Sequence, residues 1–222
     1  MRLEADYLLD RRALKRQVIF WRVLAVIIAF GCTVFIFLGW TDSQLGNAHI
    51  ASLQIKGTIY FNKDRILAIE EARDNPSVKA LLVEIDSPGG TVVGGETLYE
   101  AIRYFGDKKP VVAIMGDLAT SAGYMTALAA EKIYAQKATI TGSIGVLFQT
   151  AEFTSLLQKL GIAVEALKSS PLKGAPGPLE KMTPAARKTT ISIVNDISTM
   201  FVRMVSNRRN LSIDRASALS DG

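Results

Sequence analysis

Residues 80–105 have the sequence ALLVEIDSPGGTVVGGETLYEAIRYF, in which a glycine-rich loop joins an apolar run to a longer amphipathic stretch. The run at 80–85 has the length and composition of a buried strand, and residues 91–105 have the apolar spacing of a helix. The same order, a short apolar run followed by a helical stretch, recurs along the chain. This alternation predicts an α/β fold with a mostly parallel sheet.

The remaining elements follow from the same pattern. Strands are expected at residues 50–55, 111–115, 132–135 and 163–167, and helices at 63–74, 121–130, 154–160 and 183 to about 207. Thr183 followed by Pro184 is typical of a helix start, with threonine as the N-cap and proline in the first turn. We assign the whole α/β domain to residues 50–222.

An apolar segment precedes this domain. Residues 23–40 contain no charge, so we predict a transmembrane signal-anchor helix at 18–40, after a cytoplasmic basic segment at 1–17 and before a polar linker at 41–49. Basic residues gather on its amino-terminal side, which predicts that the amino terminus lies inside and the domain outside. They are Arg2, Arg11, Arg12, Lys15, Arg16 and Arg22. The alternatives are a cleaved signal peptide, a lipoprotein modified at Cys32 and a buried helix of a soluble protein.

Charge and rare residues exclude several classes of function. The chain of 222 residues has 26 basic and 21 acidic side chains, a formal net charge of +5, and part of that excess belongs to the anchor region. The nearly neutral domain lacks the excess of basic residues that is typical of nucleic-acid-binding domains. One cysteine excludes an intramolecular disulfide and zinc sites built from cysteine pairs, and the single histidine, His49, excludes His-rich metal centres.

The glycine-rich loop is the first candidate site. Its paired glycines let backbone N–H groups approach a ligand closely, and the helix that follows favours negative charge, so the loop can stabilise an oxyanion. A phosphate loop is the functional alternative, but the chain has no GxxxxGK[ST] motif. An ordinary tight turn between strand and helix is the structural alternative.

Ser121 is the candidate nucleophile. It lies in GDLATSAGYMTALA, at the expected junction between a strand and a helix, where a side chain is exposed at the end of the sheet. The stretch is not a GxSxG elbow, because Ala119 lies two positions before the serine. A simple serine N-cap explains the position equally well.

A serine nucleophile needs a base, and His49 is far from these loops in the sequence. The loop LKSSPLKGAPGP at 167–178 offers Lys168 and Lys173. A lysine can act as a base where burial lowers its pKa from about 10.4 towards neutrality. The alternative is that both lysines are merely solvated.

Four motifs together resemble the signal peptide peptidase A family of membrane-bound serine proteases: SPGG at 87–90, ATSAGY at 119–124, TGSIGV at 141–146 and KSSPLKG at 168–174. The resemblance covers residues 50–211 and implies a Clp-protease/crotonase-like fold of repeated ββα and βα units. It implies that Ser121 is the nucleophile and Lys173 the general base of a Ser/Lys dyad. It also implies an oxyanion hole at Gly90 and Ala122, with Ser143 orienting the lysine. Lys168 is the competitor for the base.

The resemblance implies a biological setting as well. It implies a protease without metal or cofactor in the bacterial cytoplasmic membrane, with the catalytic domain on the extracytoplasmic side. The partners would be apolar peptides such as cleaved signal peptides, the lipid bilayer and further copies of the chain in a homo-oligomer with shared active sites.

The sequence departs from the family pattern in two places. Ala122 stands where glycine is commonest, and the chain stops at SDG where family members continue, so we expect a C-terminally incomplete domain. A catalytically inactive truncated membrane scaffold, or a peptide-binding protein of the same fold, is therefore the alternative function. Acyl-CoA chemistry on the same fold is a third, although a CoA enzyme has no reason to lie outside the cytoplasm.

Overall fold

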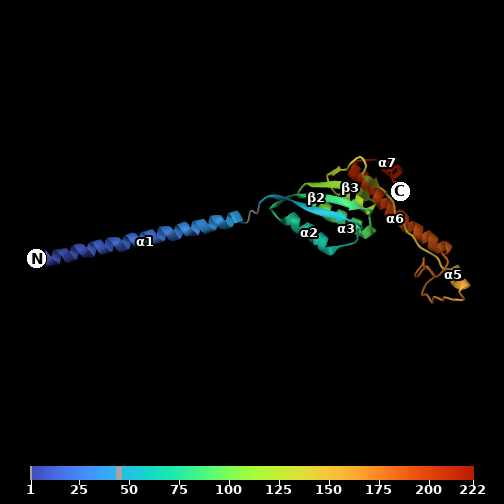
Figure 1. Ribbon diagram of the computed structural model, residues 1–222, viewed down its shortest axis with the longest axis horizontal. Helices are drawn as coiled ribbons and strands as arrows, with labels where there is room; N and C mark the ends of the chain where they lie inside the picture. The colour runs from blue at the N-terminus through green and yellow to red at the C-terminus, as the bar shows by residue number, and fades with distance from the viewer. Residues whose placement is uncertain (1, 44–46) are drawn as a thin grey trace. The chain divides into compact units, whose positions relative to one another are not determined.

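The computed structural model describes residues 2–43 and 47–222, and in the first helix it describes the side chains of residues 15–35 only. The chain divides into two compact units, Met1–Ala48 and His49–Gly222 (Figure 1). We describe each unit by itself.

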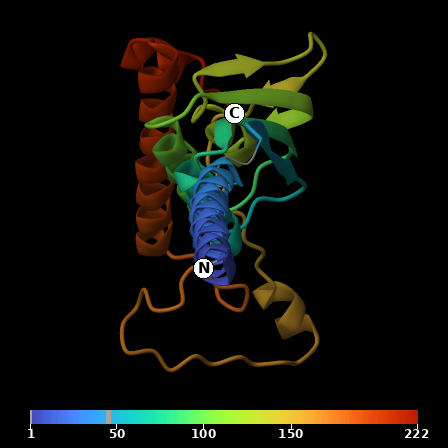
Figure 2. The same cartoon turned by 90° about the vertical axis from the view of Figure 1, so that its left-hand side faces the viewer.

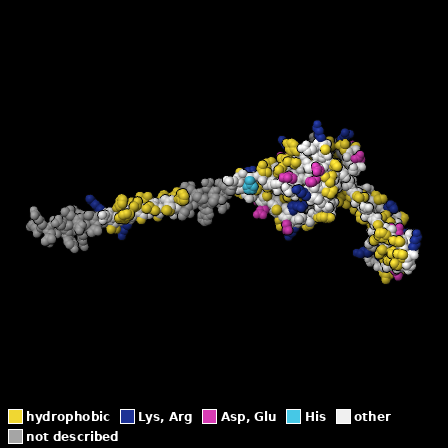
Figure 3. Space-filling model, viewed as in Figure 1, with side chains coloured by type: hydrophobic (Ala, Val, Ile, Leu, Met, Phe, Trp, Pro, Cys, Tyr) yellow, Lys and Arg dark blue, Asp and Glu magenta, His cyan; other side chains and the backbone are white. Residues whose placement is uncertain are grey.

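The first unit contains the helix α1 (Arg2–Ser43). Its described stretch Lys15–Phe35 is long and apolar enough to cross a membrane, by length and composition alone. The hydrophobic side chains of this stretch are exposed, with Phe35 at 80% (Figure 3). The helix contains the predicted segment 18–40. The predicted linker 41–49 was partly wrong, because residues 41–43 are helical and His49 begins a strand, while residues 44–46 lie outside the described part of the chain.

The second unit contains a parallel sheet. Its strands follow one another in the order β1 (His49–Lys56), β2 (Val78–Ser87), β3 (Val111–Thr120) and β4 (Lys132–Tyr134), and β5 (Ile140–Gly142) pairs with the second half of β3. The helices α2 (Lys63–Asp74), α3 (Val92–Gly106) and α4 (Ala122–Ala127) connect the four strands. The predicted parallel α/β architecture is therefore confirmed.

Strand order explains where the core lies. Parallel strands that follow one another in sequence order are joined by right-handed crossovers, which place the connecting helices on one face of the sheet. Val83 and Ala113 point to that face and are fully buried, together with Ile102 and Phe105 of α3. On the opposite face Ile114 is 42% exposed. The glycine-rich loop and Ser121 follow β2 and β3, at the carboxyl edge of this sheet.

One strand prediction was wrong, and one strand was missed. Residues 163–167 form no strand; Leu167 is 93% exposed, because an apolar run becomes a strand only where a neighbouring strand pairs with it. The three-residue strand β5 was not predicted, and its position depends on pairing Thr120 with Gly142 rather than on its own composition.

The helix predictions differ from the structure mainly at the carboxyl ends. The expected helix 121–130 ends earlier, at Ala127, as α4. Beyond this end, the guanidinium of Arg208 donates hydrogen bonds to the carbonyls of Leu128 (2.7 Å) and Ala130 (3.0 Å). Arg208 lies on α6 (Pro184–Arg209), the predicted long helix. Thr183 caps it as predicted, by accepting a bond from the Ala186 N–H at 3.2 Å. The short helix α7 (Ile213–Ala218) was not predicted.

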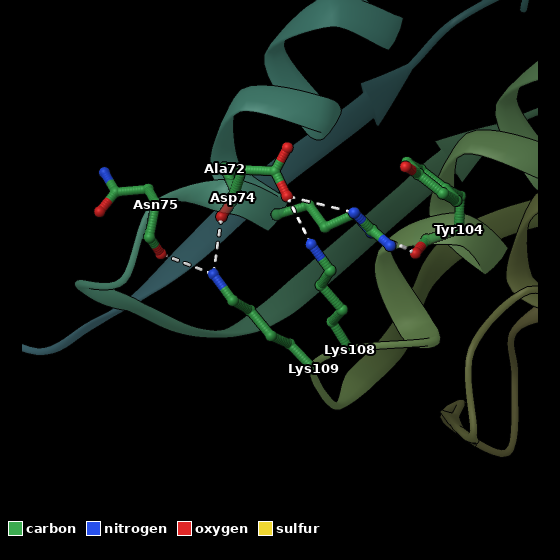
Figure 4. A network of polar contacts seen from close by, with 7 residues as sticks. Ala72, Asp74, Asn75, Tyr104, Lys108 and Lys109 are labelled. Atoms are coloured by element: carbon green, nitrogen blue, oxygen red, sulfur yellow. Dashed lines mark hydrogen bonds and ion pairs between the residues drawn. The ribbon is translucent and has the colours of Figure 1, made fainter.

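A polar network closes the carboxyl end of α2 (Figure 4). Lys109 Nζ donates to the carbonyls of Ala72 (3.1 Å) and Asn75 (2.6 Å), and Lys108 Nζ lies 2.9 Å from the Asp74 carboxylate. The hydrogen bond from Lys108 lowers the pKa of Asp74, and burial lowers the pKa of Lys109. These lysines therefore tie the turn before β3 to the turn before β2.

Residues 147–182, which we name the arm, connect the sheet region to α6. Figures 1 and 2 show the arm extending past the amino-terminal end of α6, away from the sheet. It contains one short helix, α5 (Thr154–Lys159), and its two legs are joined by a hydrogen bond from the Phe153 N–H to the Pro178 carbonyl at 2.8 Å. Hydrophobic side chains are prominent on its surface (Figure 3).

Candidate active site

Ser121 has the backbone geometry of a residue held at a sharp turn. It follows β3 directly and precedes α4, with φ 52° and ψ −121°. A positive φ is unfavourable for a residue with a Cβ atom and persists only where the surrounding structure enforces it. The Ser121 N–H donates to the Gly142 carbonyl at 2.9 Å, which fixes the turn against β5.

The hydroxyl of Ser121 does not cap the helix that it precedes. Asn62, Thr91, Thr183 and Ser212 each accept a bond from an N–H in the first turn of their helices, whereas Ser121 makes no such bond. Within the described chain its Oγ has no hydrogen-bond partner. The simple N-cap interpretation of Ser121 therefore fails, and a strained serine with an unused hydroxyl is left at the edge of the sheet.

The glycine-rich loop lies against this serine. Gly89, with φ 107°, approaches so closely that a Cβ atom on it would lie 2.8 Å from the Ser121 Cβ and 3.1 Å from the Ala122 nitrogen. Ser87, which is fully buried, holds the loop: its hydroxyl donates to the Gly57 carbonyl at 2.6 Å and accepts from the Gly89 N–H at 3.1 Å. Sequence reasoning missed both residues as parts of the site, although the paired glycines of the SPGG motif pointed to Gly89.

Two backbone N–H groups near Ser121 are available to a ligand. Ala122 is the first residue of α4, so its N–H has no acceptor within the helix. The Gly90 N–H is not donated to any backbone carbonyl of residues 47–222. Together with the helix end these groups can stabilise a developing negative charge. The structure thus brings Ser121, Ala122 and the Gly89–Gly90 loop together.

The close approach of Gly90 to Ile59 gives a testable expectation. A Cβ atom on Gly90 would lie 1.9 Å from the Ile59 carbonyl oxygen, so Gly90→Ala must displace the backbone of the loop. We expect this substitution to lower the free energy of unfolding by roughly 1–3 kcal/mol, as overpacking does elsewhere. Urea unfolding followed by far-UV circular dichroism measures the change.

Gly106→Ala is the matched control for this prediction. A Cβ on Gly106 would meet its nearest neighbour at 3.7 Å, which is an ordinary van der Waals contact. We expect a much smaller change in that variant. Equal stability of the two variants would contradict the tight packing of the loop on Ile59.

A backbone hydrogen bond of the preceding residue places Ser143 near Ser121, the candidate nucleophile. It follows Gly142, whose carbonyl accepts the Ser121 N–H, and it also has a positive φ, 47°. Its side chain is exposed. Two strained serines are therefore held at one edge of the sheet, on neighbouring segments.

The two candidate lysines lie on the arm. Lys173 is exposed, and the structure does not bring it into hydrogen-bond contact with Ser121 of the same chain. The ammonium of Lys168 is half-buried and forms an ion pair with the carboxylate of Glu180. The ammonium of Lys168 is thus engaged by a carboxylate, whereas Lys173 forms no ion pair with any residue that the structure describes.

Comparison with known proteins places the chain in a family. The model of peptidase family S49 matches residues 104–222. A Synechocystis protein assigned as a protease is 32% identical, over 82% of this chain and 66% of its own length. An Enterococcus faecium protein assigned as a signal peptide peptidase is 27% identical, over 82% of this chain and 57% of its own length. A mutant ClpP1 from Listeria monocytogenes aligns with a TM-score of 0.47 and 16% identity, over 78% of this chain and 80% of its own. The chain belongs to peptidase family S49.

Proposed function

We propose that the protein is a membrane-anchored serine endopeptidase in which Ser121 attacks the peptide bond and Lys173 is the general base. The observation that carries this proposal is the strained Ser121 turn, whose hydroxyl is unused and lies beside two available N–H groups. Strain of this kind gathers at functional sites, where the surrounding structure maintains it. The family membership of the chain agrees with peptide hydrolysis as the reaction.

The mechanism is acyl transfer. Lys173 in its neutral form takes the proton from the Ser121 hydroxyl as the oxygen attacks the carbonyl carbon. The N–H groups of Gly90 and Ala122 stabilise the oxyanion of the tetrahedral intermediate, and each such donor is worth about 3–4 kcal/mol in other serine proteases. The C–N bond then breaks as protonated Lys173 gives its proton to the leaving amine. Water hydrolyses the acyl-enzyme and restores the serine.

The base is supplied by a second copy of the chain. The arm that carries Lys173 extends away from the sheet, and it exposes large apolar side chains that a partner subunit would cover. Leu147 and Leu167 are the most exposed of these. A homo-oligomer in which each arm reaches the Ser121 turn of its neighbour would cover this apolar surface and complete each site, with Ser143 orienting the incoming lysine.

The substrates are apolar peptides at the membrane, including cleaved signal peptides. An apolar α1 would hold the enzyme in the bilayer where such peptides are released, and the Enterococcus relative bears the name of that activity. In a bacterial cytoplasmic membrane the basic residues before the apolar stretch would keep the amino terminus inside and the domain on the extracytoplasmic side.

Hydrolysis of a quenched fluorogenic peptide with an apolar core tests this function. The full chain is assayed in a neutral detergent, and we expect time-dependent release of the cleaved product. Binding of the peptide without cleavage would contradict the proposal and support the inactive scaffold instead.

A further inference from the structure

The buried turn that follows α4 is held by a side chain from a distant part of the sequence. Leu128 and Ala130 are buried in this turn, and carbonyl groups at the end of a helix have no partner within the helix. Arg208 supplies these partners: its Nε donates to the Leu128 carbonyl at 2.7 Å, and its Nη2 donates to the Ala130 carbonyl at 3.0 Å. A planar guanidinium presents its donors in a fixed geometry, so the two bonds define the position of the helix end.

The helix that carries Arg208 also packs on α4. Met125 and Leu128 of this region belong to the same buried apolar cluster as Phe201 and Val205 of α6. Arg208 forms no ion pair with any residue that the structure describes, so its guanidinium is committed to the turn after α4. The position of α4 is therefore set from α6, by apolar packing and by the guanidinium at the carboxyl end of α4.

The opposite end of α4 carries the candidate catalytic groups. The helix has six residues and is about 9 Å long, at 1.5 Å per residue. The Ser121 carbonyl accepts a bond from the Met125 N–H at 2.9 Å, and the Ala122 carbonyl accepts one from the Thr126 hydroxyl at 2.9 Å. Because these bonds join the serine and the oxyanion donor to a single short helix, a shift at Leu128 displaces both of them.

The fit of α4 against the glycine-rich loop is close. A Cβ atom on Gly123 would lie 3.0 Å from the Ser87 carbonyl oxygen, and a Cβ atom on Gly95 would lie 2.8 Å from the Ala122 Cβ. The N–H groups proposed to bind the oxyanion, those of Gly90 and Ala122, thus belong to two segments that must stay in contact. A displacement of about 1 Å in catalytic geometry can lower a rate by about 10²-fold.

We propose that Arg208 is a positioning residue for peptide hydrolysis, an inference that rests on the proposed function. By fixing the carboxyl end of α4, it keeps Ser121 and the Ala122 N–H in place opposite the Gly90 N–H. Arg208 does not touch the reacting atoms and acts through the helix. An interaction that matters only in the transition state changes kcat and leaves substrate binding as it was. Loss of Arg208 should therefore lower kcat and spare KM.

Kinetics per competent site test this role. Arg208→Met is compared with Arg209→Met, the same change at the next, exposed position of α6. Reactive sites are first counted with a fluorophosphonate probe at complete reaction. For the quenched apolar peptide in neutral detergent we expect kcat per labelled site to fall about 10–100-fold in Arg208→Met, with KM nearly unchanged, and to stay at the wild-type value in Arg209→Met. A merely stabilising role would lower the number of labelled sites and leave kcat per site unchanged.

A transition-state analogue gives a second readout. The Ser121 oxygen bonds to the carbon of a peptide aldehyde, its proton passes to the base, and the aldehyde oxygen becomes the oxyanion. We expect Arg208→Met to weaken aldehyde binding by the same factor as kcat, and to leave the affinity for uncleaved peptide unchanged when it is added to Ser121→Ala. Arg208→Lys, which keeps the charge and a donor, should lose less, and it carries the test in case Arg208→Met does not fold.

Hydrogen exchange separates failure of this inference from failure of the proposed function. Mass spectrometry of the full chain follows the amides of residues 121–130, which we expect to exchange faster in Arg208→Met than in Arg209→Met. An active wild type with an unchanged kcat per site in Arg208→Met would overturn the positioning role and leave the peptidase intact. A wild type that cleaves no peptide would overturn the peptidase, while faster exchange in Arg208→Met would still support the hold of Arg208 on α4. Unchanged exchange would overturn that hold as well.

Discussion

Ser121→Ala is expected to lower kcat for the apolar peptide by roughly 10⁴-fold or more, the scale of nucleophile loss in other serine proteases. The reason is chemical: the alanine has no oxygen to attack the carbonyl, while the Gly90 and Ala122 N–H groups that bind the oxyanion stay in place. Steady-state hydrolysis of the quenched peptide in detergent measures the loss.

The Ser121→Ala chain should remain folded. The hydroxyl of Ser121 makes no hydrogen bond within the described chain, so its removal breaks no interaction, and the Ser121 N–H bond to Gly142 is a backbone bond that alanine retains. Ser192→Ala, an exposed change on α6, is the control and should keep full activity. Turnover by Ser121→Ala at the rate of the Ser192→Ala chain would exclude Ser121 as the nucleophile.

Lys173→Met is expected to be as inactive as Ser121→Ala when each variant is assayed alone, and a mixture of the two is expected to regain activity. If the serine and the lysine of one site come from different subunits, random assembly of equal amounts gives intact pairs at about a quarter of the sites. The two chains are unfolded or dissociated together, reassembled in detergent and assayed against the wild type treated in the same way.

Lys168→Met is the matched control on the same arm. Its ammonium is paired with Glu180 rather than free, so we expect this variant to retain most of the activity. A fully inactive Lys168→Met chain beside an active Lys173→Met chain would reverse the assignment of the base. Mixtures that regain nothing would show that the dyad, if present, forms within one chain.

The parallel sheet could be predicted from the sequence because each strand is a short apolar run followed by a helix of clear spacing. The helix over Lys63–Asp74 was predicted with its observed bounds, and the start of the last long helix followed from Thr183 and Pro184. Such features depend on local composition and capping, which the sequence contains directly.

Features that depend on tertiary pairing could not be predicted in this way. The strand β5 exists because Gly142 pairs with Thr120, and residues 163–167 are not a strand because no neighbour pairs with them. The strained backbone of Ser121 is likewise held by its hydrogen bond to the Gly142 carbonyl and by the close approach of Gly89. Both partners are distant from Ser121 in the sequence. The sequence alone therefore could not separate a nucleophile from a helix cap at this serine.

Covalent labelling tests the central claim, that Ser121 is an activated nucleophile, most directly. The full chain in neutral detergent is treated with a fluorophosphonate probe, digested and mapped by mass spectrometry. We predict a single adduct on the peptide containing Ser121, and its loss in Ser121→Ala. An adduct on another serine, or no adduct in a chain that hydrolyses the apolar peptide, would contradict the assignment.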